Sequence, residues 1–234
     1  MGWLRKEKIP KPLKMLAEQS HRWAGVVAGP PGSGKTTFLR AIVNIVSDKS
    51  RGIIVVSVKE RFNSDLDSVL IPEEVVANGI GGIFHFTVEG IRPTFDAIAA
   101  YKPRTLDEVE NILTSKFKMD VAEWGLHRLR IMKQWLVESN GIRYIKVPLY
   151  LGDHDELARR LVVGILYVAR RHLPYIYIFD DTMAFILNEP YKEAALAMMR
   201  PYIAVVNRYL DARETLYHNP YVVTPGGSGV CAAA

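Results

Sequence analysis

The 234-residue sequence predicts an α/β fold with a mostly parallel sheet, flanked by helices and interrupted by a helical insertion. Two apolar runs predict the sheet. Ile53–Val58 is largely β-branched, which is typical of a strand buried on both faces, as in parallel sheets. Tyr175–Phe179 is a second such run. Strands that are buried on both faces indicate a parallel sheet.

The first predicted strand, Trp23–Ala28, leads through a glycine-rich turn into a predicted helix, Thr36–Val46. The turn, Gly29-Pro-Pro-Gly-Ser-Gly-Lys-Thr36, matches the phosphate-binding pattern G-x-x-x-x-G-K-[ST] at every fixed position. Glycines lack the Cβ that restricts φ, so successive N–H groups can point inward around the α- and β-phosphates of a nucleotide. The sequence therefore predicts a nucleotide-binding protein with a P-loop NTPase sheet.

Each loop residue has an expected role. Lys35 reaches the β- and γ-phosphates as a catalytic cation, the Thr36 hydroxyl binds Mg²⁺, and Thr37 contacts the α-phosphate. The helix that starts at about Lys35 directs its positive end at the same phosphates. The predicted phosphate-binding residues are Gly29, Pro30, Pro31, Gly32, Ser33, Gly34, Lys35, Thr36 and Thr37.

The Tyr175–Phe179 run ends in Asp180 and Asp181, which is the form of a Walker B element. Open α/β sheets bind their ligands beyond the carboxyl ends of the strands, where these acids emerge. We expect Asp180 to hold Mg²⁺ and Asp181 to polarise the attacking water. The chain has no N-K-x-D base-reading motif of GTPases, so ATP is the expected nucleotide.

The charge, the cysteine count and the length of the apolar runs limit the partners and the compartment that we expect for this protein. The net charge of +5 permits a polyanionic partner without requiring one. The single cysteine, Cys231, excludes an internal disulfide and fits a reducing cytoplasm. Cys231–Ala234 also matches a prenylation box, but no basic run precedes it. No apolar run reaches the ~18 residues of a membrane span, so no membrane partner is expected.

The predicted domain spans residues 23–225, after a basic arm at 1–22 and before a flexible tail at 226–234. The insertion is placed at about 93–141. The arm is either a solvated tail or an electrostatic contact. Three capping boxes, which begin at Thr105, Asp120 and Asp153, predict helix starts.

The remaining predicted elements are ordered along the chain as follows: a strand at 83–88, helices at 105–118 and 121–139, a strand at 142–149, a helix after 153, helices at 191–200 and from Pro201 to about 216, and a strand at 221–224. The apolar stripe of helix 121–139 is either core packing or a substrate contact. Thr224 is either a polar sensor of the γ-phosphate or a strand cap.

With the phosphate loop at 29–36 and the strand that ends in Asp180 and Asp181, the chain resembles the additional-strand P-loop ATPases. Among these it is most similar to the FtsK–HerA group, which includes viral genome-packaging ATPases. The resemblance rests on the early phosphate loop, the strand ending in Val58-Lys59-Glu60, and Phe179-Asp180-Asp181. It implies an oligomeric ring that moves double-stranded DNA. It also implies that Arg213 acts as a finger in a neighbouring subunit's site, with Thr224 as the sensor.

The sequence thus favours a cytoplasmic, Mg²⁺-dependent ATP hydrolase that acts as a DNA-translocating or DNA-packaging motor. A regulatory ATPase that acts on a protein partner and a P-loop small-molecule kinase remain as alternatives. The paired acids at Asp180 and Asp181 favour hydrolysis over transfer to an acceptor.

Overall fold

The computed structural model describes residues 24–28, 32, 34–37, 39, 40, 43, 53–62, 67–87, 92–173, 176–180, 202–206, 221–223 and 230–232. The chain divides into two compact units. Unit 1 takes in Met1–Phe62, Pro174–Ala184 and Glu193–Ala234, and unit 2 takes in Asn63–Leu173 and Phe185–Lys192. Unit 2 therefore begins before the predicted insertion and ends after it.

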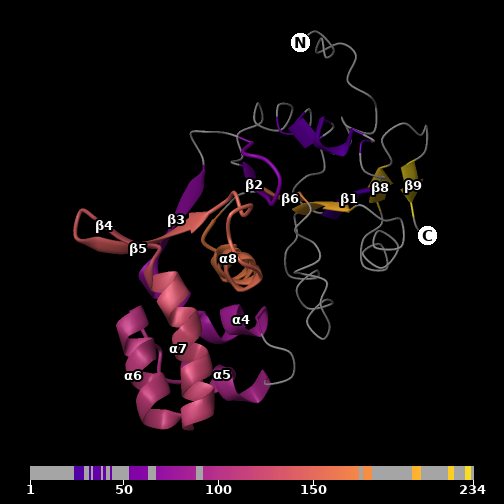
Figure 1. Ribbon diagram of the computed structural model, residues 1–234. Helices are drawn as coiled ribbons and strands as arrows, with labels where there is room; N and C mark the ends of the chain where they lie inside the picture. Colours follow the sequence, from indigo (N-terminus) through magenta and orange to yellow (C-terminus); the bar gives the residue numbers. More distant parts are fainter. Residues whose placement is uncertain are drawn as a thin grey trace. The chain divides into compact units, whose positions relative to one another are not determined.

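Unit 1 is built on a six-stranded sheet in the order β2-β6-β7-β1-β8-β9 (Figure 1). The first five strands in this order are parallel to one another, and β9 is antiparallel to β8. The strands are β1 (Ala24–Ala28), β2 (Ile53–Ser57), β6 (Ile176–Asp180), β7 (Tyr202–Val206), β8 (Tyr221–Val223) and β9 (Val230–Ala232). The predicted mixture of helices with a mainly parallel sheet is confirmed.

Two strands of unit 1 differ from the sequence-based interpretation. β7 lies where a helix is predicted from Pro201 to about 216. Its Tyr-Ile-Ala-Val-Val sequence is apolar and rich in β-branched residues, and it pairs with β6 on one side and β1 on the other. β9 lies within the predicted flexible tail, where Cys231 is paired with Val222 in the register.

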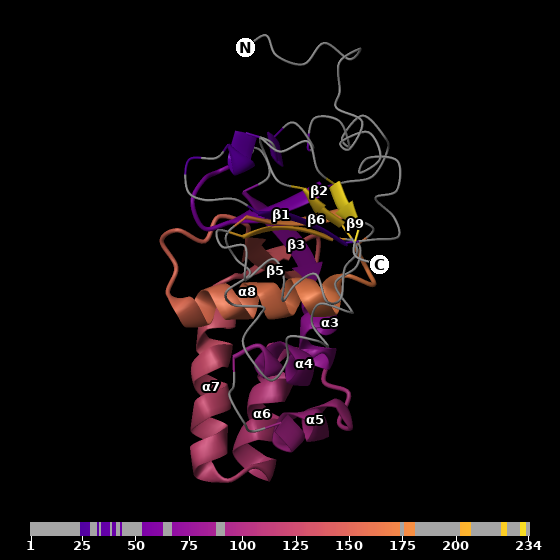
Figure 2. The same ribbon diagram turned by 90° about the vertical axis from the view of Figure 1, so that its right-hand side faces the viewer.

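Unit 2 combines a three-stranded antiparallel sheet, in the order β3-β5-β4, with six helices among its described residues. The strands are β3 (Ser68–Pro72), β4 (Leu136–Ser139) and β5 (Ile142–Pro148). The helices are α3 (Glu73–Asn78), α4 (Ile80–His85), α5 (Arg92–Ala99), α6 (Leu106–Lys116), α7 (Met119–Lys133) and α8 (Glu156–Ala169). Helix α8 packs against α3, α4 and α7, and Figure 2 shows it running across α7.

The predicted strand at 83–88 is wrong, because Ile80–His85 forms the helix α4. Its alternating aromatic and β-branched residues have the pattern of a strand. However, Ile80, Ile83 and Phe84 follow the spacing of one helix face and are fully buried. Gly81 permits this packing, since an added Cβ would lie 2.7 Å from the backbone oxygen of Phe95.

The predicted helix at 121–139 is too long. Helix α7 ends at Lys133, and β4 follows, joined to β5 by Asn140 and Gly141. These two residues have φ values of 54° and 74°, which suit a two-residue hairpin turn. An Asn-Gly sequence can end a helix or form a hairpin turn. Here it forms the hairpin, because β4 pairs with β5.

Of the three predicted capping boxes, only the one at Thr105 caps its helix as predicted. Thr105 accepts a hydrogen bond from the Glu108 N–H and caps α6 as predicted. The box at Asp120 is wrong, because α7 already begins at Met119. Helix α8 is confirmed, but Asp155 rather than Asp153 caps it, by accepting from the Ala158 N–H at 2.7 Å.

A buried carboxylate connects three elements of unit 2. Glu73, which is 3% exposed, accepts a hydrogen bond from the Leu106 N–H at 2.8 Å. Its other oxygen pairs with Arg143 Nε at 2.9 Å. Glu73 opens α3, Leu106 opens α6 and Arg143 lies on β5, so one side chain fixes the spacing of two helices and a strand.

Charged residues on α6, α7 and β5 continue this network on the surface. Lys133 Nζ lies 2.6 Å from Asp107 and also bonds to Glu110, and Arg143 lies 3.1 Å from Asp107. The hydrogen bonds from Lys133 and then Arg143 lower the pKa of Asp107. Burial lowers the pKa of Lys133, but hydrogen bonds to Asp107 and Glu110 outweigh burial and raise it.

Arg128 of α7 is buried against the end of α4. Its guanidinium donates to the Thr87 hydroxyl at 2.8 Å, to the Thr87 carbonyl at 3.2 Å and to the Trp124 carbonyl at 3.0 Å. It also lies over the Trp124 ring. Burial, with a smaller effect from the charge of Arg160, lowers the pKa of Arg128 to about 9.

Within the described part of the chain, no helix is both long enough and apolar enough to cross a membrane.

Candidate functional site

The glycine loop after β1 is described at two of its glycines. Gly32 has a φ of 81° and Gly34 a φ of 85°, both in the left-handed region that favours glycine. Among the described residues, a Cβ built at either position would meet no atom within 4 Å. At these two positions the backbone has the left-handed geometry that the glycine pattern predicts.

The residues after Gly34 enter a helix, as predicted. Lys35, Thr36 and Thr37 are helical. Lys35 is 7% exposed, whereas Thr36 is half-buried and Thr37 is exposed. A lysine buried at the start of a helix, immediately after two left-handed glycines, carries its positive charge at the place where the sequence predicts phosphates.

The acid strand and the glycine loop meet at one edge of the unit 1 sheet. β7 lies between β1 and β6, with Ala28 paired with Val206 and Asp180 paired with Val205. All three strands are parallel, so the loop after Ala28 and the Asp180 carboxylate leave the sheet at the same edge. With two strand spacings between them, the ends of β1 and β6 are about 10 Å apart.

Ser57 is a buried polar residue that the sequence reasoning missed. It ends β2, is paired with Asp180 in the register, and is 1% exposed, as is Asp180. Its hydroxyl donates to Asp180 Oδ2 at 3.2 Å. The signal available in the sequence was that Ser57 is the one polar residue within the apolar run Ile53–Val58. Parallel pairing of β2 with β6 then places Ser57 beside Asp180.

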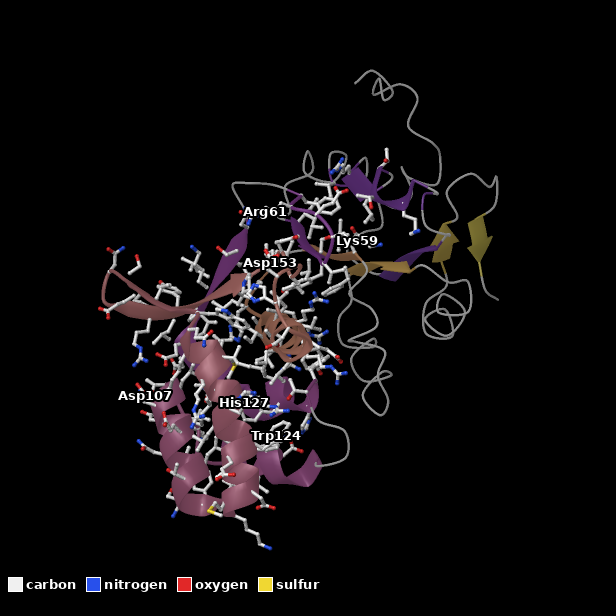
Figure 3. All side chains as sticks on the ribbon, viewed as in Figure 1. Lys59, Arg61, Asp107, Trp124, His127 and Asp153 are labelled. Atoms are coloured by element: carbon white, nitrogen blue, oxygen red, sulfur yellow. The ribbon has the colours of Figure 1, made fainter. Side chains whose placement is uncertain are left out.

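The segment after β2 connects to the helix that follows the glycine loop. Arg40 forms an ion pair with Glu60 and lies over the ring of Phe62, 5.8 Å from its centre. Lys59 and Arg61 on this segment are exposed, and Figure 3 shows both. Positive side chains therefore stand next to the edge of the sheet that carries Asp180.

Several predicted site residues lie outside the described residues. They are Gly29, Pro30, Pro31, Ser33, Asp181, Arg213 and Thr224.

The sheet order bears on the predicted sensor. Thr224 directly follows β8, which lies on the side of β1 away from β6. The strand between the glycine loop and the acid is β7, and the next residue in the chain is Asn207, which also lies outside the described residues.

The apolar stripe of α7 belongs to the core of unit 2. Trp124 stacks on Phe95, with ring centres 4.9 Å apart, and packs edge-on against Phe84 at 5.7 Å. Leu129 and Met132 are buried as well. Between the two interpretations of this stripe, the packing favours core.

The donor atoms at the sheet edge suit a hard cation. The Thr36 hydroxyl and the Asp180 carboxylate are oxygen ligands, which Mg²⁺ prefers, and it usually completes its shell with water and substrate phosphates. Among the described residues, no three or more His, Cys, Asp or Glu side chains gather into a metal-binding group. This edge of the sheet therefore offers a hydroxyl, from Thr36, and an acid, Asp180, at the side from which the glycine loop leaves.

No protein-family model, no curated protein and no solved structure matches this chain.

Proposed function

We propose that this chain is a P-loop ATPase of the additional-strand class. One observation carries the proposal: a parallel strand, β7, separates the strand of the glycine loop from the strand that ends in Asp180. That order brings a left-handed glycine loop, a buried lysine and a buried acid to one sheet edge. A nucleotide triphosphate is the ligand that uses all three.

The residues of the chain have separate tasks in this proposal. The loop amides and Lys35 bind the phosphates and stabilise the charge that develops on the transferring phosphoryl group. Thr36 and Asp180 would hold Mg²⁺, which would neutralise phosphate charge. Asp181 orients the attacking water, and Arg213 of a neighbouring copy completes the charge stabilisation.

The proposed work of the enzyme is the movement of double-stranded DNA by a ring of copies in the cytoplasm. Support comes from the net charge of +5 and from the exposed Lys59 and Arg61 near the acid strand. Cations in such a position can contact phosphates of a nucleic acid without reading its sequence.

The test is steady-state release of phosphate from Mg-ATP by the purified chain, with and without long double-stranded DNA. Lys35→Ala is the negative control, because it removes the phosphate-binding cation. Lys116→Ala, at an exposed lysine in α6, is the matched control for loss of one positive charge.

Turnover that rises severalfold with DNA, and is lost in Lys35→Ala only, would support the DNA motor. Turnover that ignores DNA but rises with a protein partner would identify a regulatory ATPase instead. Phosphate transfer to a small acceptor in place of release would identify a kinase. Equal rates for the wild type and Lys35→Ala would contradict the ATPase proposal as a whole.

A further inference from the structure

Ser57 and Asp180 are the last residues of neighbouring parallel strands, and they form a buried polar pair. The Ser57 hydroxyl lies 3.2 Å from Asp180 Oδ2. A backbone bond from the Val58 N–H to the Asp180 carbonyl, at 3.5 Å, continues the contact beyond the strand end. Both side chains are 1% exposed, so solvent does not compete strongly for this hydrogen bond.

Two further hydrogen bonds fix the orientation of the Ser57 hydroxyl. Its oxygen accepts from the Lys59 N–H and from the Glu60 N–H, each at 3.2 Å. A hydroxyl has two lone pairs and one proton. Since both lone pairs are taken by N–H donors, the proton is directed at the Asp180 carboxylate.

An oriented donor restricts the rotation of the carboxylate that it binds. Hydrogen bonds from neighbouring residues orient metal ligands in this way, and their loss typically weakens metal binding by about 10- to 100-fold. The same Ser57 oxygen holds the backbone of the turn Val58–Phe62, which carries the exposed Lys59 and Arg61. The turn and the acid are therefore joined through one atom.

We propose that Ser57 is a positioning residue that orients the Asp180 carboxylate toward bound Mg²⁺ and couples the metal affinity to the turn Val58–Phe62. This inference rests on the proposed function, because it assigns Asp180 to the metal of a Mg-nucleotide. It adds a residue outside both nucleotide motifs and a structural route by which contact at the turn reaches the metal.

The experiment measures nucleotide affinity with a fluorescent ATP analogue, first in EDTA and then across a Mg²⁺ titration. The variants are Ser57→Ala and the matched pair Ser57→Thr and Ser57→Val, which have nearly the same shape and differ in the hydroxyl. β-branched residues suit a strand, so both are compatible with β2. Ser139→Ala, at an exposed serine of β4, controls for loss of a hydroxyl.

For Ser57→Ala and Ser57→Val, we expect the affinity in EDTA to stay within about twofold of wild type, and the Mg²⁺ concentration at half-saturation to rise about 10-fold. Ser57→Thr should restore most of the metal affinity. If Ser57→Ala does not fold, as judged by circular dichroism, the Thr and Val variants provide the same comparison.

The failures are distinguishable. Unchanged metal dependence in Ser57→Val, or equal loss in Ser57→Thr and Ser57→Val, would overturn the role of Ser57 while leaving the ATPase proposal intact. A wild-type chain that binds no nucleotide would overturn both. The coupling to the turn is tested separately. Lys59→Ala and Arg61→Ala, introduced together, should change the half-saturating Mg²⁺ concentration of the otherwise wild-type chain but not that of Ser57→Val.

Discussion

The two units place their buried polar side chains differently. Among the described residues, Lys35, Ser57 and Asp180 are the buried polar side chains of unit 1, and all three lie at or directly after the ends of strands and loops on one edge of the sheet. In unit 2 they are Glu73, Thr87 and Arg128, which bridge different helices and strands. The buried polar groups of unit 1 gather at the edge of the sheet where we propose a binding site, whereas those of unit 2 connect separate helices and strands.

The difference teaches that burial alone does not identify function. A buried charge costs free energy in either unit unless it is paired or hydrogen-bonded. In unit 2 the internal bonds offset that cost within the fold. In unit 1 the acid and the glycine loop leave the sheet at the same edge, and under the proposed function a ligand would offset part of the cost of burying the acid.

The largest expected effect comes from Asp180→Asn. Turnover should fall about 100-fold or more, because the proposed Mg²⁺ site loses the negative charge of one ligand. Urea unfolding should show equal or greater stability, since an amide is cheaper to bury than a carboxylate. Asp153→Asn, at the exposed Asp153 labelled in Figure 3, is the control and should change neither quantity. An Asp180→Asn variant that is less stable but still active would contradict the proposal that the buried acid of unit 1 serves binding and not stability.

In unit 2 the corresponding change is Glu73→Ala, which should have the opposite pattern. It leaves Arg143 and the Leu106 N–H without their buried partner, and should lower the free energy of unfolding by about 3 kcal/mol. Turnover per folded molecule should be unchanged. The neighbouring Glu74→Ala is the matched control: its side chain is 61% exposed, and a loss below about 1 kcal/mol is expected. Similar losses for both variants would show that the contacts of Glu73 with Arg143 and with the Leu106 N–H contribute little to the free energy of unfolding.

Gly164→Ala tests how closely the helices of unit 2 are packed. A Cβ at Gly164 would lie 2.9 Å from the Ile83 carbonyl oxygen and 3.1 Å from Ile83 Cα, so α8 and α4 would have to separate. We expect a net loss of about 1–2 kcal/mol in urea unfolding, after the gain in helix propensity. Gly82→Ala meets only a Val168 methyl at 3.4 Å and should be neutral or stabilising. The reverse order of the two variants would contradict the packing described.

The smallest effect concerns the surface network around Asp107, whose pKa is lowered by Lys133 and then by Arg143. A lowered pKa in the folded state means that this stabilisation is present above the ordinary value of 3.8 and is lost as the pH falls below it. Asp107→Asn should therefore be less stable than wild type at pH 7, by about 1 kcal/mol or less for these exposed groups, and the difference should shrink as the pH falls below 3.8. A difference that persists at the lowest pH would rule out a charge-based cause.

Sequence reasoning located the elements in which local pattern and tertiary setting agree. Ile53–Val56 and Ile176–Phe179 are continuous apolar runs, which are typical of buried strands, and they form most of β2 and β6. Thr105 caps α6 because its side chain and Glu108 are local partners. Gly32 and Gly34 show the left-handed backbone that the loop pattern requires.

The failures occur where a distant partner decides the structure. Tyr202–Val206 becomes a strand because β1 and β6 are on either side to accept its hydrogen bonds. Ile80–His85 becomes a helix because Gly79 and Gly81 allow α8 and α5 to approach closely. The role of Ser57 depends on register with a residue far along the chain, which no local pattern encodes.

The pairing of β2 with β6 has a consequence for synthesis of the chain. Ser57 and Asp180 are 123 positions apart, and Asn63–Leu173 of unit 2 lies between them. During translation, this entire stretch is made before β6 can pair with β2, and the loop that must close is long. Until then, β1 and β2 have none of the strands with which they pair, because β1 pairs with β7 and β8 and β2 pairs with β6. We expect these unpaired apolar segments to make the growing polypeptide prone to aggregation during this interval.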